Sequence, residues 1–304
     1  MIELIRKTDI DFMGKKYIAF AISGVLTLIG LFATVQVGRG AANLGIDFAG
    51  GTAVQIKFEK QASLDSIRGL ISQAGLKDVE LQELPTENKI LIMVKKEEER
   101  LGGFSDKIVG LLEKGLPGNR ITVDSVSEIG PKVGKKLRVD ALWAVLASAA
   151  GILIYVGWRF QFRFSVGATV ATFHDVFAVM GIFYLMGREI NLILVTALLT
   201  IAGYSLTDTV VVFDRIRENL RFALKEPVEK VINRSINEVL SRTIVTSLTV
   251  FLSSLALFFT GGEVLHDFAL AMLIGIIIGT YSSVFVASPI VLLWGGSGKP
   301  LVKK

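Results

Sequence analysis

Six long apolar stretches interrupt the chain, and each is long enough to cross a membrane. They cover residues 17–38, 141–158, 164–187, 190–213, 243–262 and 268–294. Because a helix rises about 1.5 Å per residue and a hydrocarbon core is about 30 Å thick, we predict a transmembrane helix in each stretch. A signal peptide is the alternative for the first stretch, but its uncharged length and lack of a small-residue cleavage pattern favour a retained anchor.

Between the first two spans the hydrophobic pattern changes to short alternating and helical segments. The pattern predicts strands at 52–58, 77–84, 88–96 and 120–130, and helices at 63–75 and 101–115. This β-α-β-β-α-β order is typical of a small ferredoxin-like α+β domain with helices on one face. Ser63 is placed to cap the first helix. The domain has no histidine and no catalytic constellation, which favours a binding or lever module over an enzyme.

Composition agrees with a polytopic α-helical membrane protein. Hydrophobic residues make up 51% of the 304 residues, and mean hydropathy is +0.57. The absence of cysteine excludes disulfides and thiol nucleophiles, and two histidines argue against a metal site; we predict no cofactor. The net charge of +5 has a simpler origin in membrane topology than in nucleic-acid binding.

The distribution of basic residues sets the predicted orientation. With the N-terminus inside, the inner segments hold 16 Lys and Arg residues and the two short outer turns hold one. Basic flanks stay cytoplasmic, so both termini are expected there. The predicted order is a cytoplasmic N-terminus (1–16), first helix (17–38), external domain (39–140), five-helix bundle (141–294) with a cytoplasmic connection (214–242), and tail (295–304). The connection has helical spacing, which indicates either a helix along the interface or a solvated connecting helix.

Charged groups within a membrane span usually mark a functional pathway. Asp208 lies about 10 Å inside the cytoplasmic boundary of the fourth span, and Arg242 opens the fifth. Helical spacing places polar residues on a stripe with each of them; these are Thr200 and Tyr204 with Asp208, and Thr246, Thr249 and Ser253 with Arg242. Facing stripes would shield an Asp–Arg pair from lipid, and withdrawal of the arginine would then favour a proton on the carboxylate. The alternative is that Arg242 reaches the interface while Asp208 makes a static hydrogen bond to Tyr204 or Thr200.

Two further features lie inside the predicted bundle. His174 and Asp175 fall near the middle of the third span, where a structural hydrogen bond between helices is the favoured interpretation. The last span carries small residues every fourth position, which predicts close packing against a helix of this chain or of another subunit. These residues are Ala271, Gly275, Gly279, Ser283 and Ala287.

Four motifs occur in a characteristic order along the chain. They are "GIDFAGG" (45–51), "GPKVG" (130–134), "FHDV" (173–176) and "GYSLTDTVVVFDRIREN" (203–219). Together they resemble the SecD/SecF family of protein-export subunits, within the RND superfamily. The "TDT" before "DRIREN", and the lack of a long SecD-like external domain, favour SecF over SecD.

The resemblance implies a function and a set of partners. A SecF subunit of the bacterial inner membrane pairs with SecD and uses the proton motive force to promote late steps of preprotein translocation through SecYEG. YajC, the translocating preprotein and membrane lipids are the other expected partners, and nucleic acid is not. The positions that match the family's functional acidic and basic residues are Asp208 and Arg242, while His174 and Asp175 are expected to have a supporting role.

The glycine motifs predict rigid joints between membrane and external domain. Gly45, Gly50 and Gly51 allow close backbone approach and positive φ, and Asp47 can cap exposed amides. The corresponding return joint consists of Gly130, Pro131 and Gly134. A coupling role is favoured here over preprotein contact.

Two other functions are compatible with this pattern. One is an RND-type exporter subunit for small molecules or lipids, and the other is a passive scaffold for the translocase. An ATP-driven enzyme is disfavoured because the chain has no GxxxxGK[ST] phosphate loop.

Overall fold

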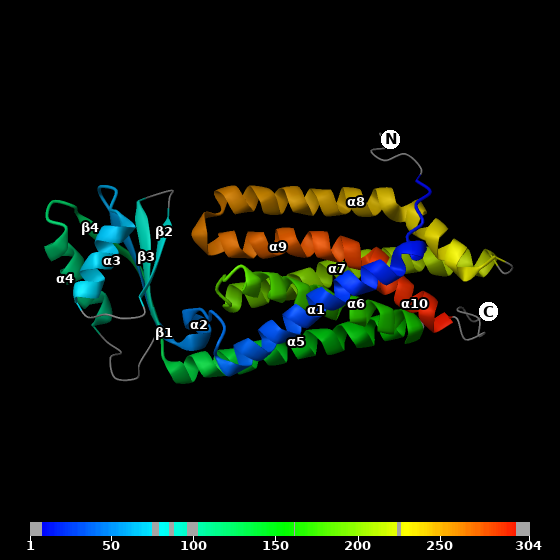
Figure 1. Ribbon diagram of the computed structural model, residues 1–304, viewed down its shortest axis with the longest axis horizontal. Coiled ribbons are helices and arrows are strands. Elements are labelled where there is room, and N and C mark those ends of the chain that lie inside the picture. Colours follow the sequence, from blue (N-terminus) through cyan, green and yellow to red (C-terminus); the bar gives the residue numbers. More distant parts are fainter. Residues whose placement is uncertain are drawn as a thin grey trace. The chain divides into compact units, whose positions relative to one another are not determined.

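A computed structural model describes residues 8–74, 79–84, 88–95, 103–160, 162–223 and 226–295. Within these ranges six helices are long and apolar enough to cross a membrane, which confirms the six predicted spans (Figure 1). Five are α1 (Lys16–Arg39), α5 (Pro131–Arg159), α6 (Phe162–Leu185), α7 (Leu192–Phe222) and α8 (Val228–Thr260). The sixth consists of α9 (Gly262–Ser282), a π-helical turn η2 (Ser283–Ala287) and α10 (Ser288–Gly295). The predicted tail lies outside the described residues apart from Gly295.

The chain divides into two compact units, and the smaller one comprises residues 43–143 together with 189–192. In the larger, helical unit, α1 packs closely against α6, and α8 runs beside α9 (Figure 1). The α1–α6 crossing depends on glycine. A Cβ at Gly30 would lie 2.0 Å from the carbonyl oxygen of Phe177, and one at Gly181 would lie 2.8 Å from the amide nitrogen of Gly30.

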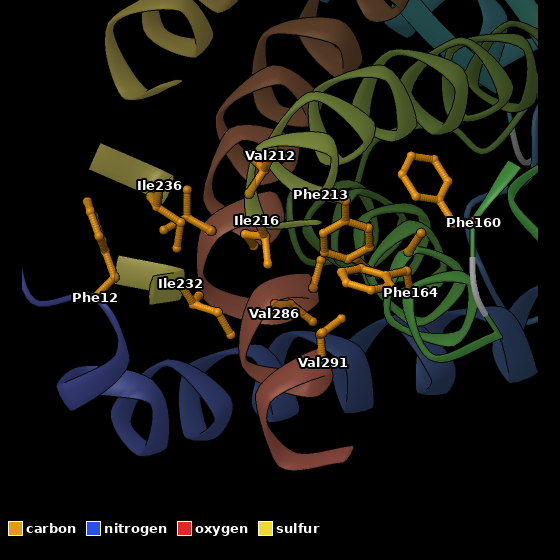
Figure 2. Packing of buried hydrophobic residues seen from close by; sticks show 14 of the residues in the cluster. Phe12, Phe160, Phe164, Val212, Phe213, Ile216, Ile232, Ile236, Val286 and Val291 are labelled. Atoms are coloured by element: carbon orange, nitrogen blue, oxygen red, sulfur yellow. The ribbon is translucent and has the colours of Figure 1, made fainter. Parts of the chain in front are cut away.

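An apolar core joins the ends of several helices of this unit. Figure 2 shows the ring of Phe213 on α7 against that of Phe164 on α6, and their centroids lie 5.1 Å apart in an edge-on arrangement. Ile232 and Ile236 of α8 and Val286 of η2 belong to the same cluster. Because these side chains are almost fully buried, the cluster fixes α6, α7 and α8 relative to the last helix.

The connection between α7 and α8 differs from the predicted interfacial helix. The described residues contain no separate helix there, because α7 continues to Phe222 and α8 already begins at Val228. Arg215 explains part of this extension, since its Nε lies 2.6 Å from Glu238 Oε2 and links the two helices. The spacing predicts helix correctly for this segment, but its residues belong to the ends of two long helices.

The N-terminal segment is fastened to the first turns of α8 by asparagine side chains. Asn233 Oδ1 accepts hydrogen bonds from the amides of Phe12 and Met13, and Asn237 Nδ2 donates to the carbonyl of Ile10. Asp11 accepts from the amide of Gly14 and from Asn233 Nδ2, and these bonds hold the pKa of the Asp11 carboxyl below its usual range. We call residues 10–13 the N-terminal strap.

Acid is expected to weaken the N-terminal strap only when the pH falls below the ordinary pKa of an aspartate. Since the ionised form of Asp11 accepts both hydrogen bonds, its contribution is fully present above the ordinary pKa of 3.8 and is lost as pH falls through the lowered value. The difference in unfolding stability between the wild type and Asp11→Ala, measured against pH, should therefore be constant near neutrality and shrink in acid. A difference that does not change with pH would exclude this role.

The smaller unit contains the predicted ferredoxin-like domain. Its elements are β1 (Gly51–Phe58), α3 (Leu64–Gln73), β2 (Val79–Leu84), β3 (Lys89–Lys95), α4 (Phe104–Gly115) and β4 (Ile121–Ile129), preceded by a short helix α2 (Ile46–Ala49). The antiparallel sheet has the order β2-β3-β1-β4, and buried side chains of β1, such as Ile56, pack with Ile67 of α3 and Ile108 of α4. The predicted β-α-β-β-α-β order is confirmed. Ser63 occupies the N-cap position of α3, but its side chain makes no capping hydrogen bond.

Candidate functional site

Asp208 lies in the interior of the helical bundle. Its residue is 8% exposed, and one carboxylate oxygen, Oδ2, has no hydrogen-bond partner among the described residues. Two hydroxyls lie near the carboxylate: that of Thr243 on α8, which has no hydrogen-bond partner among the described residues, and that of Ser283 on η2, which donates to the Gly279 carbonyl. Buried polar atoms are nearly always paired, so the unpaired carboxylate oxygen makes Asp208 a candidate functional residue.

Arg242 does not pair with Asp208 in this structure. Its side chain is exposed, as are those of Thr246, Thr249 and Ser253, so the predicted stripe faces away from the bundle. The residues of α8 that turn inward form a second polar stripe, offset by one position, and are Thr243, Ser247 and Ser254. The facing stripes expected from the sequence are therefore not observed, because spacing alone does not say which side of a helix meets its neighbour.

Tyr204 and Thr200 are not hydrogen-bonded to Asp208. Tyr204 donates to Ser247 Oγ at 2.9 Å, and Ser247 lies 2.7 Å from the hydroxyl of Thr280 on α9. Thr200 donates to the carbonyl of Thr196 on its own helix. The polar chain through Tyr204 thus links α7, α8 and α9, and the static partners predicted for the carboxylate are excluded in this arrangement.

His174 and Asp175 form a buried polar cluster, as the sequence predicts. Asp175 has no exposed surface; its Oδ2 accepts hydrogen bonds from Ser205 on α7 and, at 2.8 Å, from Ser282 on α9. Its Oδ1 lies 2.9 Å from His174 Nδ1. One carboxylate of α6 therefore binds two other helices.

The small-residue stripe of the last span packs inside the chain. A Cβ at Gly275 would lie 2.4 Å from the Ile201 side chain of α7, and Ser205 of the same helix lies against Gly279. Ala271 and Ala287 are fully buried, and Ser283 Oγ lies 3.1 Å from the Thr209 hydroxyl. The stripe brings η2 up to Asp208, and such π-helical turns frequently occur at functional sites.

In the smaller unit, the "GIDFAGG" segment is joined to the connection between α6 and α7. Leu44 and Ile190 form a parallel β-bridge, and the Gly45 amide donates to the carbonyl of Ile190 at 3.0 Å. Asp47 Oδ2 accepts a hydrogen bond from the amide of Leu192 at 3.1 Å. Because Leu192 is the first residue of α7, the predicted capping role of Asp47 is confirmed, and its target is the helix that carries Asp208.

The glycines of this joint are explained by backbone geometry. Gly50 and Gly51 have φ values of +78° and +151°, and a Cβ at Gly51 would lie 2.2 Å from the Val94 carbonyl oxygen. A Cβ at Gly134 on α5 would lie 3.0 Å from the Gly50 amide nitrogen, and Pro131 starts α5 one residue after Gly130. Gly45 has negative φ and is needed for close approach to Asn191.

Removal of the Asp47 cap is expected to loosen the start of α7. Asp47→Ala should lower the unfolding free energy by about 1 kcal/mol, the usual cost of losing a capping side chain, and should speed hydrogen exchange at the Leu192 amide. Asp47→Asn is the matched control, because its side-chain oxygen still accepts the bond. Equal exchange in the alanine and asparagine variants would show that the cap is not formed.

Two family descriptions match the chain. The first, "Protein export membrane protein SecD/SecF, C-terminal", matches residues 113–297, and the second, "SecD/SecF GG Motif", matches residues 42–62. The chain belongs to the SecD/SecF family. Its SecD/SecF GG motif coincides with the joint formed by α2 and the start of β1.

The chain is similar to SecF proteins over nearly its whole length. It is 59% identical to the protein translocase subunit SecF of Thermodesulfovibrio yellowstonii over 97% of this chain and 98% of that protein. It is 44% identical to SecF of Calditerrivibrio nitroreducens, with 96% of each chain covered. The crystal structure of SecDF from Thermus thermophilus, a translocon-associated membrane protein, matches with a TM-score of 0.82 and 36% identity. The match covers 95% of this chain and 39% of SecDF, so this chain spans well under half of that SecD/SecF protein.

Sequence reasoning missed several residues of this SecD/SecF bundle. Ser205 and Ser282, which bind Asp175, and Thr243 and Ser247, which face the interior, were not singled out. Helical spacing offered a signal for two of them, because Thr243, Ser247 and Ser254 form a polar stripe of their own in an apolar span. Among the described residues no cluster of acidic or histidine side chains has the arrangement of a metal site.

Proposed function

We propose that this chain is the SecF-type subunit of a proton-driven export complex in the bacterial inner membrane. With a SecD-type partner it uses the proton motive force to promote late stages of preprotein translocation through SecYEG. The observation that carries the proposal is the buried Asp208 carboxylate with its unpaired Oδ2, inside a chain of the SecD/SecF family. Catalysis in the bond-making sense is not part of this role.

Proton binding at Asp208 supplies the energy-converting step. A proton from one side of the membrane neutralises the carboxylate, which removes a charge that is costly in a low-dielectric bundle. One charge crossing 100 mV is worth about 2.3 kcal/mol, and a pKa change of one unit is worth about 1.4 kcal/mol. These magnitudes match, so release to the other side can drive a rearrangement around α7, α8 and η2.

The joint at Asp47 supports transfer of that rearrangement to the ferredoxin-like domain. The side chain of Asp47 holds the first amide of α7, while the following residues enter β1 through Gly50 and Gly51. A displacement of α7 along or about its axis would therefore be passed to the sheet through this hydrogen bond and the short backbone from Asp47 to β1. The domain, 39–140 in the predicted organisation, then acts as the lever outside the membrane, with both termini in the cytoplasm.

The exposed polar stripe of α8 supports the proposal that a helix of the SecD-type partner packs against it. Arg242, Thr246, Thr249 and Ser253 face outward over a stretch of membrane helix, where polar groups exposed to lipid are unfavourable. Three of these side chains donate their hydroxyl groups to backbone carbonyls, namely Thr246, Thr249 and Ser253. Arg242 is therefore the residue of the stripe that would bind a group of the partner. In this role Arg242 approaches Asp208, or acidic groups of SecD, only as the assembled complex changes state.

Cysteine cross-linking tests the partner surface. Because this sequence has no cysteine, an introduced cysteine is the only one of this chain that can react. Thr246→Cys should form a disulfide with cysteines placed along a membrane helix of co-expressed SecD. Leu248→Cys is the matched control, since Leu248 is exposed on another side of the same helix and should stay unlinked. Equal cross-linking at both positions would show that this stripe is not the interface.

Two outcomes would favour the other functions. Purified complex that transports a small compound and does not associate with SecYEG would indicate an RND-type exporter. Normal preprotein export by a complex whose Asp208 carries no proton would indicate a passive scaffold.

A further inference from the structure

The His174–Asp175 pair has features that a structural hydrogen bond between helices does not require. Asp175 alone would suffice to hold α7 and α9, because it accepts hydrogen bonds from Ser205 and Ser282. Hydrogen bonds that hydroxyls donate to a carboxylate stabilise its ionised form. A fully buried anion inside a membrane bundle is costly unless a positive charge lies beside it.

His174 is the group that can supply this charge. Its side chain is 4% exposed, and its Nδ1 is engaged with Asp175 at 2.9 Å. The second ring nitrogen, Nε2, is buried and has no hydrogen-bond partner in the described ranges. With Nδ1 bonded to the carboxylate, Nε2 is free to bind a proton, which converts a neutral imidazole into an imidazolium ion.

Among the residues that the structure describes, few other ionisable groups face the pair. From α7, Asp208 interacts electrostatically with Asp175, and from α9 the ring of Tyr281 lies 6.3 Å from the His174 ring between centroids. Between Ile18 and Gly38, α1 has no titratable side chain, nor have η2 and α10. Tyr155 of α5 is half exposed at the surface. The electrostatic effect on His174 therefore comes mainly from the carboxylates of Asp175 and Asp208.

We propose that His174 and Asp175 form a second proton-binding site that acts in series with Asp208. One proton binds at His174 Nε2, and the charge of the pair changes from −1 to zero. Ser282 donates to Asp175, and the adjacent residue Ser283 lies near Asp208, so consecutive residues of the last helix reach both sites. The inference deepens the proposed function and rests on it only for the use made of the proton.

The two sites are expected to be coupled electrostatically. When Asp208 is ionised, the negative charge nearby favours the imidazolium ion at His174, and neutralisation of Asp208 weakens this preference. The bundle interior then avoids holding two uncompensated negative charges at once. Such coupling would allow proton loss at one site to follow proton gain at the other.

Nitrogen NMR of the histidine rings tests this site directly. The chain has two histidines, so His266→Asn leaves His174 as the only imidazole. The signal to follow is that of His174 Nε2, recorded in the full complex in lipid vesicles with ¹⁵N-histidine. We expect it to change from the unprotonated to the protonated form as pH is lowered. In the added Asp208→Asn variant the midpoint should move to lower pH. If His266→Asn is unstable, the His174 signal of the wild type is identified by its loss in His174→Gln.

The outcomes separate this inference from the proposed function. A His174 ring that keeps one protonation state at every pH at which the protein is folded, or a midpoint unaffected by Asp208→Asn, overturns the second site. Export that depends on Asp208 would still stand in that case. Conversely, a coupled change at His174 together with normal export by Asp208→Asn would keep the site and refute the motor.

Discussion

Asp208→Asn is expected to abolish the proton-dependent part of preprotein export while the complex still assembles. Asparagine has nearly the volume of aspartate and keeps one carbonyl oxygen for the surrounding hydroxyls, but it cannot gain or lose a proton. Export into vesicles that contain SecYEG and the SecD-type partner, measured with and without a proton gradient, checks this. The variant should export at the rate the wild type shows without a gradient.

Asp214→Asn is the matched control for this result. Asp214 lies on the same helix six residues later, but its side chain is half exposed and faces Arg159 at 3.4 Å. Exposed ion pairs contribute little to stability, so this variant should keep full stimulation by the gradient. Equal losses in both variants would show that any change of charge on α7 is harmful and that Asp208 is not special.

Gly30→Ala is expected to cause the largest loss of stability among glycine-to-alanine substitutions in the bundle. The new methyl group would lie 2.0 Å from the backbone oxygen of Phe177, and backbone cannot rotate out of the way as a side chain can. The helices α1 and α6 must therefore separate, at a cost of about 1–3 kcal/mol for overpacking. Thermal unfolding in lipid nanodiscs should show this as a lower Tm.

Gly24→Ala provides a control on the same helix with the same substitution. No atom outside the local backbone lies within 4 Å of a Cβ at Gly24, and alanine is the better helix former. Its Tm should be unchanged or slightly raised. Equal effects of the two substitutions would mean that α1 does not cross α6 at Gly30.

The helices and the small domain follow from the sequence because their signals are long or repeated. A run of some twenty apolar residues has few stable forms other than a membrane helix, and the alternation in 52–58 and 88–96 specifies strands. The glycines at 50 and 51 were equally informative, since positive φ restricts the choice of residue. In each case one local property determined the outcome.

The side-chain partners within the bundle could not be predicted in the same way. Two polar stripes on α8 differ by one residue, and the position of the neighbouring helices decides which is buried, so Thr243 rather than Arg242 lies by Asp208. Similarly, Ser205 and Ser282 contact Asp175 only because the small residues of α9 let it approach α7. These contacts depend on tertiary packing between segments far apart in the chain.

Infrared difference spectroscopy of the assembled complex tests most directly whether Asp208 binds and releases a proton. Spectra recorded between high and low pH in lipid should contain a carbonyl band of a protonated carboxyl group that disappears in Asp208→Asn and persists in Asp214→Asn. This is the result that proton-driven export by a SecF-type subunit requires. A spectrum in which no band depends on Asp208 at any pH would contradict it.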